Sequence, residues 1–267
     1  MPETNLKVAL LAHDTVVGNI VANLRIVDDT IAGLTPDTDL VILPEMFNTP
    51  FTTDSSVLEQ TAESNDGTTV TNLQRISDNK GIAICGTFTA RENNLYFNRG
   101  FFIRPGEAPI FYDKRHLFSA GGESEILTRG TTLAPIIEFK SWHFKMAICY
   151  DLRFPAWNRA KANNYDALIV PANWPHSRAY AWRHLLIARA IENQAYVLGC
   201  NRSGEDLYGS YTTDDTLAFD HWGKEISLRS DSDPSVVYAT LEHEKLTNAR
   251  TKFRPWRDAD EFSIELS

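Results

Sequence analysis

The chain contains several short segments in which nearly every residue is apolar. Such segments are typical of strands that are covered on both faces, because each side of the strand then contacts apolar neighbours. Each is too short for a long buried helix, and polar residues separate it from the next. We predict buried strands at residues 8–12, 40–43, 82–88, 144–149, 167–170 and 195–200.

Segments with helical periodicity lie between these predicted strands. Residues 19–34 keep their apolar side chains roughly on one helical face, and residues 70–79 form a shorter segment of the same kind. Residues 182–194 are rich in Leu, Ala and Ile and contain few helix breakers. Residues 95–112 alternate instead and contain Pro105-Gly106, which predicts a β-hairpin. The alternation of strands and helices predicts an α/β fold.

Two of the predicted strands have similar sequences. Residues 39–45 read Asp-Leu-Val-Ile-Leu-Pro-Glu, and residues 166–172 read Asp-Ala-Leu-Ile-Val-Pro-Ala. A fold of two related halves, each ending a strand at a common site, would leave this similarity. The carboxyl ends of strands are where open α/β sheets place their chemistry.

Composition limits the class of protein more than it indicates a function. A chain of 267 residues fits one large α/β domain or two small ones, and no linker divides it, so we expect a single domain over residues 1–267. The formal net charge of −9 argues against nucleic acid or an anionic membrane as a partner, because both require a basic patch. The N-terminus lacks the features of a secretory signal, and no segment approaches the ~20 apolar residues of a membrane helix. We expect a cytoplasmic protein with no membrane partner.

Cys149 differs from the other two cysteines in its surroundings. Three cysteines are too few and too scattered for a disulfide framework, and none forms a metal-type pair. Cys85 and Cys200 lie within or at the end of apolar segments, where cysteine acts as a small buried hydrophobe. Cys149 ends an apolar segment and is followed closely by the charged residues Asp151 and Arg153. A strand that ends at a cysteine and then turns presents a candidate nucleophile.

Glu45 and Lys114 are candidate partners of this thiol. Glu45 directly follows an apolar strand and Pro44, and apolar surroundings raise a carboxyl pKa and make it a better base near neutral pH. Lys114 begins a run of three basic residues, which is usually a solvated face. In a partly dry site a lysine can instead stabilise a developing oxyanion. Taken singly, a loop glutamate and a solvated lysine remain open as alternatives.

The segments around Glu45, Lys114 and Cys149, taken together and in this order along the chain, resemble the nitrilase superfamily of carbon–nitrogen hydrolases. The resemblance spans most of the chain and extends to residues 257–262 near its end. Residues 114–118, residues 172–175 and the tail are most similar to bacterial omega-amidases, which hydrolyse the terminal amide of 2-oxo acid amides such as 2-oxoglutaramate. The matching segments are Leu43-Pro44-Glu45-Met46-Phe47, Tyr112-Asp113-Lys114-Arg115-His116-Leu117-Phe118, Ile148-Cys149-Tyr150-Asp151-Leu152-Arg153-Phe154-Pro155, Pro171-Ala172-Asn173-Trp174-Pro175 and residues 188–194.

The resemblance implies an αββα sandwich, commonly paired as a homodimer, that uses neither a metal nor an organic cofactor. It implies that Cys149 is the nucleophile, that Glu45 is the base, and that Lys114 and the backbone N–H of Tyr150 hold the oxyanion. Glu123 falls where the family places a second active-site glutamate, and Glu125 is the other candidate for that place. The tail, from about residue 245 to 267, is expected to pack on the core or on a partner subunit.

A small amide substrate that carries a carboxylate needs a cation at the far end of the pocket. Arg178 is the candidate, since an arginine fork suits a carboxylate, and an exposed loop arginine is the alternative. Phe118 and Trp174 are candidate pocket residues that would fit the core equally well. Arg153 and Glu192 are expected to brace the catalytic loops by ion pairing.

Other functions remain open from the sequence. A related hydrolase could act on nitriles, N-carbamoyl amino acids or aliphatic amides with the same three residues. A catalytically silent binding protein could keep the fold, although all three catalytic positions are present. A Cys-His protease would need His116 as its base, and the adjacent Lys114 discourages protonation of that histidine.

Overall fold

The computed structural model describes residues 5–49, 51–52 and 54–266, and two sheets packed face to face form its centre. The larger sheet has the strand order β13 (Leu228–Arg229), β14 (Val236–Leu241), β1 (Leu6–Leu11), β2 (Leu40–Ile42), β3 (Ala83–Glu92), β4 (Leu95–Ile103) and β5 (Ile110–Asp113). The smaller sheet has the order β12 (Leu217–Phe219), β9 (Tyr196–Asn201), β8 (Ala167–Ala172), β7 (Trp142–Met146) and β6 (Ile137–Phe139).

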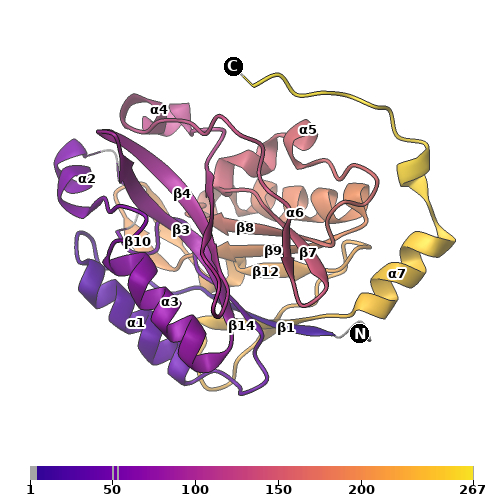
Figure 1. The fold of residues 1–267 in the computed structure, drawn as a ribbon, viewed down its shortest axis with the longest axis horizontal. Helices are drawn as coiled ribbons and strands as arrows, with labels where there is room; N and C mark the ends of the chain where they lie inside the picture. Colours follow the sequence, from indigo (N-terminus) through magenta and orange to yellow (C-terminus); the bar gives the residue numbers. More distant parts are fainter. Residues whose placement is uncertain (1–4, 50, 53, 267) are drawn as a thin grey trace.

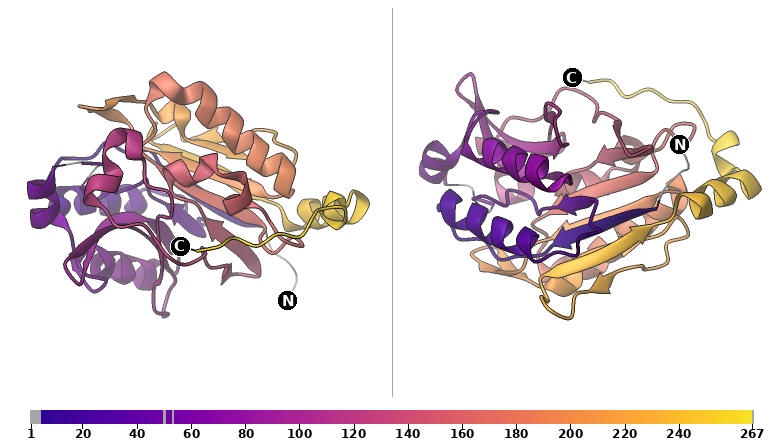
Figure 2. Two further views of the ribbon diagram at one scale, coloured as in Figure 1. Left: turned by 90° about the horizontal axis from the view of Figure 1, so that it is seen from above. Right: turned by 60° about the horizontal axis from the view of Figure 1, so that its bottom comes forward.

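Helices cover the outer face of each sheet (Figures 1 and 2). The helices α1 (Ile20–Ala32) and α3 (Thr68–Lys80) pack on the larger sheet, and α6 (Ala179–Asn193) packs on the smaller one. The layers therefore follow the order αββα, which confirms the predicted sandwich and the three predicted helices. The short helices α2 (Ser55–Thr61) and α5 (Pro155–Asn158) lie in loops.

The central strands of each sheet are the apolar segments predicted from the sequence. β1, β2 and β3 run parallel in one sheet, and β7, β8 and β9 run parallel in the other. Their inner faces share one core, in which Ile42 and Phe102 of one sheet meet Phe144 and Ile169 of the other. Burial of these side chains between the sheets drives the assembly of the two halves.

Local signals also explain where several elements begin and end. The side chain of Asn19 accepts a hydrogen bond from the N–H of Ala22 and caps α1. Gly81 ends α3 with φ +70°, a left-handed conformation that suits glycine. The predicted hairpin over residues 95–112 is the antiparallel pair β4–β5, and Pro105-Gly106 lies in its connection.

The end of the chain returns to the first strand and then leaves the sandwich. β14 pairs antiparallel with β1, which the sequence analysis did not predict. After α7 (His243–Lys252) and the turn η5 (Pro255–Arg257), the tail runs beside the sandwich (Figure 1). The carbonyl of Phe262 accepts a hydrogen bond of 2.6 Å from Lys161 Nζ. None of the helices in the described ranges is long and apolar enough to cross a membrane.

Candidate active site

The segments that follow β2 and β8 meet at one end of the sandwich. The backbone N–H of Asn173 donates to Oε2 of Glu45 at 2.8 Å, and the Asn173 side-chain amide donates to the Glu45 carbonyl at 2.9 Å. These two strands have the similar sequences noted above, and they come from different sheets. The contact joins the two halves of the sandwich at the point where each of these strands ends.

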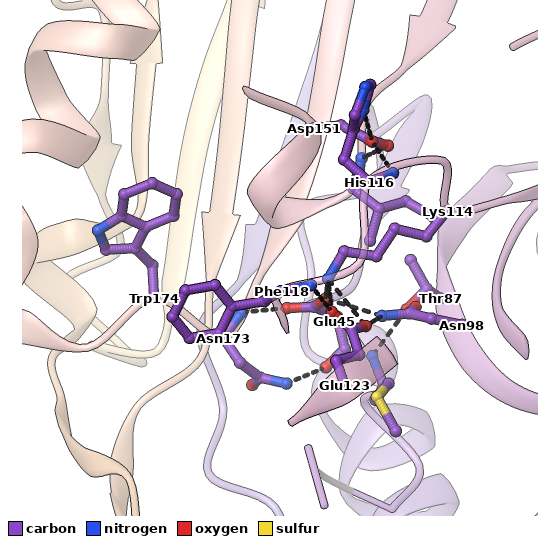
Figure 3. Close-up of polar contacts among 12 residues, drawn as sticks. Glu45, Thr87, Asn98, Lys114, His116, Phe118, Glu123, Asp151, Asn173 and Trp174 are labelled. Atoms are coloured by element: carbon purple, nitrogen blue, oxygen red, sulfur yellow. Dashed lines mark hydrogen bonds and ion pairs between the residues drawn. The ribbon is translucent and has the colours of Figure 1, made fainter. Parts of the chain in front are cut away.

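Lys114 lies between two buried carboxylates (Figure 3). Its Nζ donates to Glu45 Oε1 at 2.8 Å and to the two oxygens of Glu123 at 2.9 and 2.8 Å. Burial disfavours the charged amine, but the charges of Glu123 and Glu45 outweigh burial and raise the pKa of Lys114. Lys114 is therefore an ammonium group held in a dry site.

Glu123, and not Glu125, belongs to this cluster. Both lie in the short helix α4 (Glu123–Ile126), where residues two apart face different directions. Glu123 is fully buried, whereas Glu125 is exposed. The backbone N–H of Phe118 donates to Glu123 Oε2 at 2.6 Å and fixes the carboxylate further. The structure thus separates the two candidates that the sequence left open.

Asn98 of β4 also links Glu45 and Glu123. Its side-chain N–H2 donates to Glu45 at 2.8 Å and to Glu123 at 3.2 Å. Thr87 of β3 donates its hydroxyl to the Asn98 oxygen at 2.8 Å, and accepts the N–H of Met46. This chain of hydrogen bonds turns the donor end of the amide toward both carboxylates.

Cys149 lies on a strained turn that the Asp151 carboxylate holds. The turn η2 (Cys149–Arg153) begins three residues after β7 ends, so the thiol lies beyond the strand that was predicted to reach it. Cys149 has φ +44°, a left-handed conformation that non-glycine residues rarely adopt. The buried Asp151 accepts the N–H of Ile148 at 3.1 Å and the hydroxyl of Tyr112 at 2.8 Å. The carboxylate thereby stabilises the turn that presents the sulfur.

The Cys149 thiol is neutral in the resting site. Burial raises the pKa of Cys149, and the charge and hydrogen bond of Glu45 raise it further, whereas Lys114 lowers it. Glu45 lies beside both the thiol and the ammonium group. The arrangement suits a reaction in which the thiol loses its proton to a carboxylate while it attacks an electrophile.

The cluster opens into a pocket of about 520 Å³, measured out to its mouth. Aromatic side chains and two arginines, Arg153 and Arg178, form most of the wall beyond Cys149, Glu45 and Lys114. The other lining residues are Phe51, Phe118, Gly121, Tyr150, Asn173, Trp174, Pro175, Tyr208 and Tyr211.

Residues 7–251 match the sequence model of the family described as carbon-nitrogen hydrolase. The chain belongs to this family. It is 37% identical over 260 residues to omega-amidase YafV of Escherichia coli (strain K12), an alignment that covers 97% of this chain and 98% of that protein. It is 28% identical to the 2-oxoglutaramate amidase of Bacillus subtilis (strain 168), over 91% of this chain and 93% of that protein.

The solved structures give the same family. A CN-hydrolase superfamily protein from Xanthomonas campestris, XC1258, was crystallised with an arsenic adduct in its active site. It matches this structure with a TM-score of 0.90 and 32% identity, and the match covers 98% of this chain and 100% of that chain. The chain is therefore a hydrolase that acts on carbon–nitrogen bonds.

In this carbon–nitrogen hydrolase the predicted ion pairing of Arg153 is wrong. Glu192 accepts a hydrogen bond of 2.8 Å from Arg189, whose guanidinium also donates to the carbonyl of Leu152 in the turn that carries Cys149. Glu192 thus supports the turn through Arg189. The guanidinium of Arg153 lies 4.8 Å from the ring centroid of Trp174 and lines the pocket instead.

His116 binds the carboxylate of Asp151, which holds the turn that carries Cys149. Its backbone N–H and Nδ1 both contact Asp151 Oδ1, at 2.9 and 2.8 Å, and its ring stacks on Phe154 at 3.7 Å. Among the described residues that line the pocket, none is a histidine. This arrangement does not support the Cys-His protease interpretation. In the described part of the chain, no group of three or more His, Cys, Asp or Glu side chains could hold a metal ion.

Several residues of the site were missed in the sequence analysis. Asn173 comes directly after the second of the two similar strands, so that similarity could have identified it. Asn98 and the adjacent Arg99 are polar residues in a strand whose other side chains are apolar or aromatic, which is a weaker signal. Phe51, Tyr208 and Tyr211 come from segments without any regular pattern, and no sequence signal places them in the pocket.

Proposed function

We propose that this hydrolase is an omega-amidase that converts a 2-oxo dicarboxylic acid monoamide, of the 2-oxoglutaramate type, to the acid and ammonia. The similarity to an omega-amidase and to a 2-oxoglutaramate amidase over nearly the full length supports this substrate class. The observation that carries the proposal is that the thiol shares its pocket with two arginines, Arg153 and Arg178, that have no carboxylate partner among the described residues.

In the proposed reaction, Cys149 attacks the amide carbon while Glu45 accepts the thiol proton. The proton has to leave during the attack, because the thiol is neutral at rest and the thiolate is the nucleophilic form. Lys114 and the N–H of Asn173 each hold one oxygen of Glu45, so the carboxylate keeps its orientation. The Lys114 ammonium and the backbone N–H of Tyr150 stabilise the oxyanion that forms on the carbonyl oxygen.

Glu45 then carries the proton through the remaining steps. It passes the proton to the amide nitrogen, and the carbon–nitrogen bond breaks. Ammonia is released, and the acyl group remains bound to Cys149 as a thioester. Water gives a proton to Glu45 and attacks the thioester carbon. The carbon–sulfur bond breaks, the acid leaves, and the proton returns to the sulfur. Glu123 acts as a positioning residue in every step, since both its oxygens hold Lys114.

Arg178 and Arg153 bind the substrate carboxylate in this proposal. The guanidinium of Arg178 lies 5.1 Å from the ring centroid of Phe118, and that of Arg153 lies beside Trp174. Stacking on an aromatic face leaves the N–H edge of an arginine available to an anion. A planar carboxylate matches that edge with two hydrogen bonds. Phe118 and Trp174 therefore act by holding the arginines as well as by lining the pocket.

The outer face of α6 is the proposed homodimer surface. Tyr180 and Ile191 on this helix are 79% and 52% exposed, and Trp222 and Phe253 are 53% and 55% exposed. The rings of Trp222 and Phe253 stack at 6.4 Å, and the neighbouring Gly223 packs against Ile191. A cluster of exposed apolar side chains favours burial against a partner.

We also place the enzyme in the cytoplasm, where thiols such as that of Cys149 stay reduced.

Ammonia release by the purified protein tests the substrate class. We expect the highest kcat/KM with 2-oxoglutaramate, compared with glutamine, asparagine, a simple aliphatic amide, an N-carbamoyl amino acid and a short nitrile. Glutamine is the matched control, because it differs from 2-oxoglutaramate only in having an amino group in place of the oxo group. A higher kcat/KM for the nitrile or the N-carbamoyl amino acid would refute the omega-amidase proposal.

A further inference from the structure

One wall of the pocket is a short hairpin that belongs to neither sheet of the sandwich. Its strands, β10 (Gly204–Asp206) and β11 (Gly209–Tyr211), pair with each other. Tyr208 in the turn and Tyr211 in β11 both line the pocket. The Tyr208 ring also packs edge-on against Phe51 with the ring centroids 5.0 Å apart. The hairpin therefore shapes the pocket although it carries none of the reacting groups.

A buried arginine holds this hairpin. Arg202 directly follows β9, and its side chain is 1% exposed. Its guanidinium donates to Asp206 at 2.8 Å and to Asp14 at 2.6 Å, and it lies 4.7 Å from the ring centroid of Tyr211. The side chain of Asp14 is 62% exposed, whereas that of Asp206 is 10% exposed. The contact to Asp206 is therefore the less screened of the two.

Asp206 connects Arg202 to the hairpin residues that line the pocket. Its second oxygen, Oδ1, accepts the backbone N–H groups of Tyr208 and Gly209 at 2.8 and 3.2 Å. The same oxygen accepts the hydroxyl of Tyr211 at 3.1 Å. Burial and the Asp206 charge raise the pKa of Tyr211, so the hydroxyl remains a donor. One carboxylate thus fixes the turn and both pocket tyrosines.

The hairpin also supports the segment that carries Arg178. Gly209 has φ +150°, and a Cβ at this position would lie 3.2 Å from the Cβ of Pro175. Pro175 immediately precedes the turn η3 (His176–Arg178), and β11 packs against this turn. A displacement of the hairpin would therefore displace both the tyrosine wall and the backbone that positions Arg178.

Arg202 is not available to bind substrate itself, because its side chain is buried and its charge is met by two carboxylates. We infer that Arg202 and Asp206 are positioning residues that set the specificity of the pocket for a short carboxylate-bearing amide. They hold Tyr208, Tyr211 and the Arg178 segment in place without touching the substrate. The identity of that substrate rests on the proposed function, whereas the positioning role rests on the hairpin contacts.

Asp206→Asn and Asp14→Asn form a matched pair of variants. Each removes one charged partner of Arg202, but of the two carboxylates only Asp206 holds the turn and Tyr211 by hydrogen bonds, whereas Asp14 packs against Gly204 of β10. We expect Asp206→Asn to raise KM for 2-oxoglutaramate about tenfold and to leave kcat within about twofold, because a displaced wall weakens binding while the reacting groups stay in place. Asp14→Asn should change KM by less than about threefold, since an exposed ion pair contributes little.

Alkylation of Cys149 by iodoacetamide supplies a readout that does not depend on the substrate. Its rate should be the same in wild type and in both variants. Equal changes of KM in the two variants, or a loss of kcat as large as the rise in KM, would overturn the positioning role. If circular dichroism shows that Asp206→Asn is unfolded, Tyr211→Phe decides the question, and an unchanged KM in that variant overturns the inference. If wild type prefers another amide, the proposed function fails, and the same comparison on that amide still tests the hairpin.

Discussion

Replacing Lys114 with methionine removes the ammonium group and keeps an unbranched side chain of similar length. In the wild type, Nζ donates to one oxygen of Glu45 and to both oxygens of Glu123, and all three side chains are at most 2% exposed. Removing one partner of a buried charge cluster typically costs about 3–5 kcal/mol of stability. Two carboxylates would then repel each other in a dry site that contains no cation.

Two separate losses follow from this single change. Loss of the oxyanion cation should lower kcat about 10²–10³-fold. Loss of stability should appear in urea unfolding followed by circular dichroism. The double variant Lys114→Met with Glu123→Gln removes one of the stranded charges, so it should recover part of the stability and none of the activity. Wild-type kcat in Lys114→Met would refute the catalytic role, and an unchanged unfolding free energy would refute the account of the buried cluster.

The other predictions concern single residues with matched controls. Cys149→Ala should abolish ammonia release, whereas Cys85→Ala and Cys200→Ala should retain most of it. Cys85 and Cys200 are fully buried in the core between the sheets. A tenth of the wild-type rate in Cys149→Ala would contradict the mechanism. Glu123→Gln should lower kcat at least about tenfold, and the exposed Glu125→Gln should not. Steady-state kinetics near pH ~7, within the range of about pH 5–8 where proteins are most stable, can decide this. Arg178→Ala should weaken binding of 2-oxoglutaramate by about 2–5 kcal/mol and have less effect on binding of a neutral short amide. Arg75→Ala, at an exposed position on α3, is the control. Equal effects on both substrates would assign Arg178 a role in loop structure alone. Since the pKa of Cys149 is raised, iodoacetamide alkylation should keep increasing with pH above the ordinary range of a cysteine, and a plateau below pH ~7 would show a resting thiolate instead.

The sequence predicts those parts of the fold that depend on local patterns. The buried parallel strands appear as apolar segments, and the β4–β5 hairpin appears because Pro105-Gly106 interrupts an alternating pattern. The position of β14 was missed, because its pairing with β1 joins segments at opposite ends of the chain. Local propensity carries no information about such a long-range contact.

The candidate site shows the same division. Glu45, Lys114 and Cys149 could be found because each lies in a recognisable motif. The position of the Arg153 side chain could not be predicted, because its direction beyond the strained turn depends on packing against Trp174. The β10–β11 hairpin has no apolar alternation, and its position depends on the side-chain contacts of Arg202 and Asp206. Only the three-dimensional arrangement reveals that these residues shape the pocket.

The acyl-enzyme provides the most direct test of the central claim. Wild-type protein is mixed with 2-oxoglutaramate, quenched in acid during turnover, and examined by intact-protein and peptide mass spectrometry. We predict a mass increase of one 2-oxoglutaryl group on the peptide that contains Cys149, with no such increase in Cys149→Ala. An adduct on Cys85 or Cys200, or rapid ammonia release by Cys149→Ala, would contradict the account.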